Sequence, residues 1–163
     1  MVTAQQVKEL RDRTGISMMA CKKALEVSDG NIEKALEVLR EEGAKVADKK
    51  SSRDLNAGTI NAYVHATKQI GVMVEVRSET DFVAKHGDFQ TFAYDVAMHI
   101  AAMDPVCISE DGLEEGSENT KEDTLLGQTY IKDPSKTVDG HLKEMIQKFG
   151  ENIEITRFVR YAV

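Results

Sequence analysis

The spacing of apolar residues changes period part-way along this chain, and that change constrains the fold more than any other feature. Up to about residue 43 apolar side chains recur every three or four positions, which is the period of a helix buried on one side. Between Thr59 and Val76 they alternate with polar residues, which is the period of a half-buried strand. The chain must therefore combine helices and strands, with a boundary between these two regions.

Three short helices are predicted before the change of period. Met18, Cys21 and Leu25 fall on one apolar stripe of the second helix, so they are expected in its core. Three such helices predict a small bundle over residues 1–44, of a kind often used for docking. The residues expected to cap or end the helices are, in chain order, Thr3 with Gln6 as a capping box, Gly15, Ser17, Gly30, Asn31 and Gly43.

Residues 45–57 are charged and have no apolar period, so they are predicted to form a linker. The remainder, residues 58–163, is predicted to form a core. Strands near 59–64 and 72–76 have the pattern of a β-hairpin. A long helix with Phe89, Phe92 and Ile100 on one face is expected to lie across the hairpin and to stop at Asp104.

The net charge of −7 comes mostly from one segment, residues 108–124, which has seven acidic residues and few large apolar ones. It is expected to be a solvated loop, and the rest of the chain is nearly neutral. A chain without a basic face is not expected to bind nucleic acid directly. A helix between Thr137 and Gly150 and a final strand complete an α+β fold: a small antiparallel sheet with helices on one face. The apolar positions of that strand shift phase before Phe158, which suggests either a bulge or an exposed aromatic residue.

Several classes of function lack their motifs. There is no glycine-rich phosphate loop, and the four histidines have no partners at metal-ligand spacing, so neither a nucleotide site nor a metal site is predicted, and no cofactor. Cys21 and Cys107 are too few for a disulfide framework and favour a reducing compartment. With no apolar stretch long enough to span a bilayer, a cytoplasmic location is expected.

One constellation leaves alternatives open. Glu79 and Asp81 flank Thr80 where a strand is expected to pass into a helix, and two carboxylates can share acid and base roles in a small hydrolase. Alternatively, Thr80 or Asp81 caps the helix. Capping does not explain Phe82, an aromatic residue upstream of the helical stripe, and an acid beside an aromatic at such a corner suggests a protruding contact.

Here the residues resemble a known family. Thr80-Asp81-Phe82-Val83-Ala84-Lys85 is similar to the signature of the elongation factor Ts family, usually written TDFVAKN. The N-terminal region from LRDRTGISMMACKK onward resembles that family's ubiquitin-associated-like (UBA-like) module, and IKDPSKTV with GENIEITRFVRY resembles its C-terminal part. The chain departs from the pattern at His86, at Gly127, where Glu is usual, and at residues 108–124, which replace a longer helical stretch.

The resemblance implies a translation elongation factor that acts as a guanine-nucleotide exchange factor, without bond chemistry. It would bind the GTPase elongation factor Tu and promote GDP release by inserting Asp81 and Phe82 near the Mg²⁺ and phosphate site. The alternative is a non-catalytic helical adaptor that binds other partners, and no membrane partner and no particular oligomeric state are predicted. The residues expected to contact Tu are Thr80, Asp81, Phe82, Val83, Met19, Lys22, Lys23 and His65.

Overall fold

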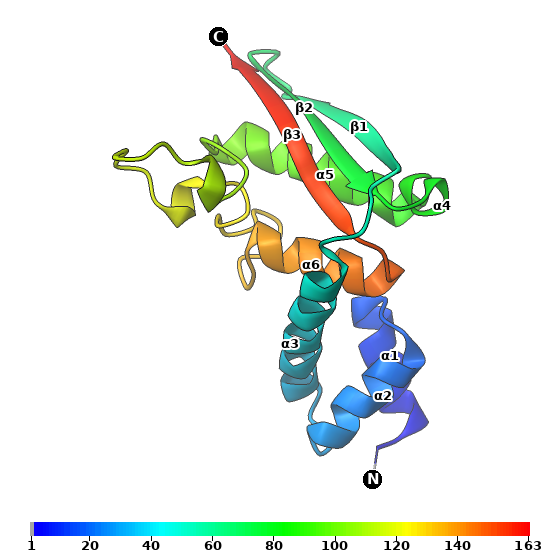
Figure 1. The fold of residues 1–163 in the computed structure, drawn as a ribbon. Coiled ribbons are helices and arrows are strands. Elements are labelled where there is room, and N and C mark those ends of the chain that lie inside the picture. Colours follow the sequence, from blue (N-terminus) through cyan, green and yellow to red (C-terminus); the bar gives the residue numbers. More distant parts are fainter. Residues whose placement is uncertain (1) are drawn as a thin grey trace. The chain divides into compact units, whose positions relative to one another are not determined.

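The computed structural model describes residues 2–163, whose contacts group into two compact units. The first unit comprises the described residues through Ser52 together with Lys143–Glu151. The second comprises Arg53–Leu142 together with Asn152–Val163. The two units thus alternate along the chain: Arg53–Leu142 of the second unit separates the two segments of the first, and Asn152–Val163 follows them (Figure 1). The domain limits expected from the sequence stay predictions, because this grouping does not test which part folds alone.

The first unit contains the three expected helices: α1 (Ala4–Thr14), α2 (Met18–Val27) and the longer α3 (Ile32–Lys50). The capping box at Thr3 and Gln6 is confirmed, and Gly15 ends α1 in the left-handed conformation with φ of 70°. Ser17 and Asn31 cap α2 and α3 as expected. The helices enclose a small core of Val7, Leu10, Ile16, Cys21, Ala24, Leu25, Ala35 and Leu39.

The predicted end of the third helix at Gly43 is wrong, because α3 continues to Lys50. Its buried stripe goes on through Gly43 and Ala47, whose side chains are too small to show as an apolar period. A Cβ on Gly43 would lie 2.9 Å from Oε1 of Gln147, and Lys50 Nζ donates a hydrogen bond of 2.6 Å to the carbonyl oxygen of Gly150. Segment 143–151 of the same unit therefore lies along this part of α3.

The second unit is built on a three-stranded antiparallel sheet in the order β1 (Ala57–Val64), β2 (Ile70–Ser78) and β3 (Ile153–Ala162). Helix α5 (Gly87–Met103) contacts β1 and β2, and the alternate residues Val72, Val74 and Val76 of β2 are buried (Figure 1). The expected bulge is confirmed: Glu75 pairs with Arg157 and Val76 with Ile155, so that Thr156 is the extra residue.

The acidic segment forms a loop between α5 and α6 (Val138–Phe149). Leu125 N donates to Cys107 O at 2.8 Å and Leu126 N donates to Ile108 O at 2.9 Å, which fixes the base of the loop. Within residues 108–124, all of which the structure describes, the regular elements are two single-turn 3₁₀ helices, η1 (Glu110–Gly112) and η2 (Lys121–Asp123). The segment is thus shaped by turns.

A buried histidine joins the end of this loop to α5. His99 is fully buried, Ile131 N donates to its Nδ1 at 3.2 Å, and its Nε2 lies 3.0 Å from Oε1 of Gln128. Burial lowers the pKa of His99. His99 therefore has a structural role, because it links α5 to the segment that follows the loop.

The α+β class predicted from the sequence is confirmed, with helices first and then a small antiparallel sheet packed against helices. Likeness of the first three helices to a UBA-like module stays a prediction. No helix among residues 2–163 combines the length and apolar character needed to cross a membrane.

Candidate functional site

The predicted contact residues at Thr80–Val83 form a sharp corner in the second unit. Strand β2 ends at Ser78, and the four-residue helix α4 (Asp81–Ala84) begins three residues later. Thr80 is the N-cap of α4, and its Oγ1 accepts a hydrogen bond of 3.4 Å from Val83 N. Capping by Thr80 is therefore confirmed, and it holds the chain where it turns away from the sheet.

The corner presents Phe82 to solvent while burying its neighbours. The Phe82 side chain is 80% exposed, whereas Val83 is 2% exposed and Ala84 is also buried. Gln90 of α5 donates a 2.6 Å hydrogen bond to the carbonyl oxygen of Ala84, which ties α4 to the longer helix. Consecutive helix residues point in different directions, so burial of Val83 and Ala84 turns the aromatic ring outward. Among the predicted contact residues of this corner, Val83 is thus an anchor in the core.

Asp81 precedes Phe82 on the same exposed edge. Its Oδ2 lies 3.3 Å from Lys85 Nζ, and both side chains are largely in solvent, so the pair contributes little to stability. The carboxylate stands in the first turn of α4, where a negative charge is favoured. An acid and an aromatic ring are therefore offered together, and neither is used to hold the fold.

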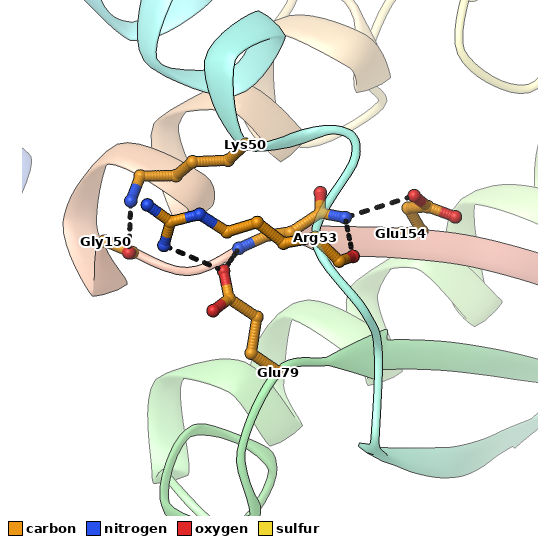
Figure 2. A network of polar contacts seen from close by, with 6 residues as sticks. Lys50, Arg53, Glu79, Gly150 and Glu154 are labelled. Atoms are coloured by element: carbon orange, nitrogen blue, oxygen red, sulfur yellow. Dashed lines mark hydrogen bonds and ion pairs between the residues drawn. The ribbon is translucent and has the colours of Figure 1, made fainter.

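Glu79, the other acid of the proposed pair, lies in different surroundings. Its Oε1 accepts a hydrogen bond of 2.6 Å from Asn152 N and lies 3.3 Å from Arg53 Nη1 (Figure 2). One carboxylate is thus engaged with the protein and the other faces water. The two acids thus have different partners, since Asp81 pairs with Lys85 and Glu79 with Arg53 and Asn152.

Three further predicted contact residues lie in the first unit, at the start of α2. Met19 is 75% exposed, and with Lys22, Lys23 and Glu42 it lines a shallow depression. Lys23 Nζ lies 2.8 Å from Glu42 Oε1, and this hydrogen bond raises the pKa of Lys23. The lysines are paired with acids, since Lys22 Nζ lies 3.7 Å from Glu26.

Met18 was expected in the core of this unit, and that expectation is wrong: its side chain is 44% exposed. Met18 is the first residue of α2, and side chains there tilt toward the N-terminus, beyond the layer formed by Cys21 and Leu25. The exposed methionine surface is therefore larger than the sequence predicted, because Met18 and Met19 are next to each other.

His65 follows the end of β1 in the second unit and is exposed. Its Nδ1 lies 3.0 Å from the hydroxyl of Tyr63, and the Tyr63 ring meets Tyr94 edge-on with 5.8 Å between centroids. This small aromatic group orients the imidazole. Throughout residues 2–163 there is no group of three or more histidine, cysteine, aspartate or glutamate side chains arranged to hold a metal ion.

Sequence reasoning missed the partners of Glu79. Arg53 and Asn152 are 26 and 73 positions from it, and neither belongs to a recognisable motif. A local pattern carries no signal for contacts at such separations. The remaining predicted residues are found where the sequence placed them: at a strand-to-helix corner, at the start of the second helix, and before a hairpin turn.

Comparison with known proteins shows the family to which the chain belongs. The sequence model described as Elongation factor TS matches residues 3–121, which include Thr80–Lys85. The chain belongs to the elongation factor Ts family. Elongation factor Ts of Acetivibrio thermocellus is 46% identical over 192 residues, covering 99% of this chain and 89% of that protein. Elongation factor Ts of Thermosipho melanesiensis is 43% identical over 194 residues, covering 100% of this chain and 99% of the relative.

Membership makes the chain a translation elongation factor of the Ts family. The alignment with the Acetivibrio thermocellus protein spans 192 residues, more than the 163 residues of this chain, so that relative has residues that this family member lacks. The family match also ends at residue 121, inside the acidic segment.

Proposed function

We propose that this chain binds elongation factor Tu and promotes the release of its GDP. The observation that carries the proposal is the exposure of Phe82. In this member of the elongation factor Ts family the Phe82 side chain is 80% exposed, on an anchored corner beside Asp81. A large exposed aromatic residue next to a charge is typical of an interface hot spot. The corner is held by Thr80 and by the burial of Val83, so the ring needs little reorganisation to engage a partner.

The mechanism requires no bond chemistry in this chain. Asp81 and Phe82 insert between helices of the Tu nucleotide domain near its Mg²⁺ and phosphate site. Binding of the chain then weakens the binding of GDP to Tu. The coupling is reciprocal, so bound GDP lowers the affinity of Tu for the chain by the same factor. GTP binding can therefore displace the chain in turn.

The first unit supplies a second contact in this proposal. Met19, Lys22 and Lys23 dock on Tu as part of a UBA-like module over residues 1–44, and the core of residues 58–163 carries the corner and His65. A flexible thioether such as that of Met19 adapts well to a partner surface. Because Lys22 and Lys23 are paired with Glu26 and Glu42, the docking face is nearly neutral, and this contact should depend only weakly on salt.

The deciding experiment follows release of a fluorescent GDP from Tu as the concentration of this chain is raised. Phe82→Ala should lower the maximal release rate by about tenfold or more, since loss of a hot-spot ring is worth roughly 2 kcal/mol and about 1.4 kcal/mol is a factor of ten. The concentration giving half the maximal rate should change less, because Met19 and its neighbours still dock.

Tyr161→Ala is the matched control, because Tyr161 is an aromatic residue of the same unit with a similarly exposed side chain (73%), at the end of β3. It should leave the maximal rate close to that of the parent. Equal rates for Phe82→Ala and Tyr161→Ala would show that exposure alone, and no insertion at the corner, explains Phe82.

A further inference from the structure

Glu79 stands immediately before the Thr80 corner and connects three separate segments of the second unit. It follows β2, which ends at Ser78. Arg53 is the residue at which the chain first enters the second unit, and Asn152 is the residue at which it returns from segment 143–151. Both entry residues contact the same oxygen, Oε1 of Glu79 (Figure 2).

These contacts form a closed ring. Asn152 N donates to Glu79 at 2.6 Å, Arg53 Nη1 donates to Glu79 at 3.3 Å, and the Asn152 amide Nδ2 donates to the carbonyl oxygen of Arg53 at 3.2 Å. Asn152 is buried and the Glu79 side chain is 20% exposed, so the charge-assisted bond from Asn152 N to Glu79 is better shielded from water than the exposed ion pairs elsewhere among the described residues. The position of Glu79 is thus fixed from two sides.

Neighbouring contacts reinforce the same place. The guanidinium group of Arg77 donates to the carbonyl oxygen of Leu55, so the entering segment is tied to β2 a second time. Ser78, which is fully buried, donates through its hydroxyl to the carbonyl oxygen of Thr80 at 3.1 Å. Glu79 lies between the two ends of this last bond, at the residue where the strand turns toward α4.

Helix α4 needs such support because of its length. Four residues are far too few for a helix to be stable by itself. The Phe82 ring is exposed and gains no position from packing, so its place is set by the backbone on either side. Thr80 and Gln90 fix the helix itself, and the Glu79 ring is the contact that fixes the strand end from which it departs.

We infer that Glu79 is a positioning residue for nucleotide exchange: its carboxylate, held by Arg53 and Asn152, sets the direction in which Asp81 and Phe82 are presented. This inference rests on the proposed function. In that function Asp81 and Phe82 contact Tu, and Glu79 acts only by holding them in place. Its loss should therefore reduce the maximal rate of GDP release more than it reduces docking.

Three variants separate this role from a general effect on folding. Glu79→Ala removes both hydrogen bonds of Oε1, and Glu79→Gln keeps an oxygen for Asn152 N while removing the charge opposite Arg53. Glu75→Ala is the matched control: Glu75 is a carboxylate within β2, the strand that precedes Glu79, and it is paired with Arg157 at 2.8 Å. Hydrogen bonds from Thr156 and Arg157 lower its pKa. It is four residues away from Glu79, within the sheet.

Two measurements are made on the full-length chain. The first is the maximal rate of fluorescent GDP release from Tu and the chain concentration at half of that rate. Glu79→Ala should lower the maximal rate about tenfold and change the concentration at half of that rate by less than about threefold. The maximal rate of Glu79→Gln should stay within about threefold of the parent. Glu75→Ala should match the parent. A fold defect would instead move both quantities together.

The second measurement is hydrogen–deuterium exchange of the chain without Tu. In Glu79→Ala the amides of Val83, Ala84 and Lys85, which bond to Thr80 and Asp81, should lose protection, while those of α1 and α2 keep theirs. Unchanged protection at these amides would overturn the inference whatever the release rates are. If the parent chain fails to accelerate GDP release, the proposed function is wrong, and the exchange data on the free chain still decide whether Glu79 fixes the corner.

Discussion

Gly127 lies where the backbone of another segment leaves no room for a side chain. A Cβ at this position would lie 2.0 Å from the carbonyl oxygen of Lys121, a backbone atom of the acidic segment. In this chain the end of the acidic segment lies against residue 127, and only a residue without a side chain fits.

Gly127→Ala should therefore lower the free energy of unfolding by about 1–3 kcal/mol, because the Lys121 backbone must shift. Gly140→Ala is the matched control, since its Cβ would meet nothing closer than 3.5 Å within α6, and it should raise the free energy of unfolding by roughly 0.5–1 kcal/mol. Urea unfolding of the parent and both variants measures the effects. The same sign for both substitutions would contradict the close approach.

At this scale the sequence predicted the exposed members of the site and missed the one that supports them. Phe82 was recognisable as an aromatic residue outside the helical stripe, and exposure confirms that interpretation. Met18 was misplaced because a stripe defines a helix face but not where along the helix the core ends. Glu79 was considered only as a possible acid–base partner of Asp81, because its actual partners, Arg53 and Asn152, are distant in sequence.

At the scale of elements, prediction succeeded where large apolar residues mark a period. The hairpin, α5 and the bulge of β3 all follow from such residues. The length of α3 did not, because Gly43 and Ala47 bury a stripe with almost no side chain. This small-residue stripe also packs near segment 143–151, as the approach of Gly43 to Gln147 shows. That segment is far along the chain, so the sequence around α3 gives no sign of it.

The contact between α5 and the loop before α6 should respond to pH. Nδ1 of His99 accepts the hydrogen bond of Ile131, so its proton is on Nε2, facing Gln128. A second proton would occupy Nδ1 and break the bond to Ile131. Burial already lowers the pKa of His99 in the folded chain below its ordinary value of 6.5.

The sign follows from linkage. The unfolded chain binds this proton more readily than the folded chain does. The contribution of neutral His99 to the free energy of unfolding is therefore complete above about pH 6.5, and it is lost as the pH falls from there through the folded pKa. Between pH 7 and 5, the free energy of unfolding should fall with a slope of at most about 1.4 kcal/mol per pH unit from this group. Urea titrations at several pH values should show this slope in the parent and in His65→Gln. His99→Gln should lose it, and an unchanged slope in that variant would contradict the assignment.

At the scale of the molecule, each compact unit has its own core, but the first is completed by a segment from near the end of the chain. The buried cluster from Val7 to Leu39 lies wholly within residues 2–52. The partners of the last turns of α3, Gln147 and Gly150, do not.

A peptide of residues 1–52 should therefore fold only in part. Its amides should remain protected from hydrogen exchange through about Leu39, and those of residues 44–50 should exchange faster than in the full chain by about tenfold or more, because the segment that covers them is missing. Exchange measured by nuclear magnetic resonance on the peptide and on the full chain provides the test. Equal protection of residues 44–50 in both would show that α3 is stable without segment 143–151.

The hydrogen bond between Lys50 and Gly150 joins residues 100 positions apart, and this separation has a consequence during synthesis. A ribosome adds residues at about 5–20 per second, so roughly 5–20 seconds pass between these two residues. In the course of that interval the three helices leave the exit tunnel, and the small-residue stripe of α3 is then uncovered, because segment 143–151 has not yet been made. The last turns of α3 thus wait for almost the whole chain, and a nascent chain stalled before residue 143 would present that stripe to chaperones and proteases.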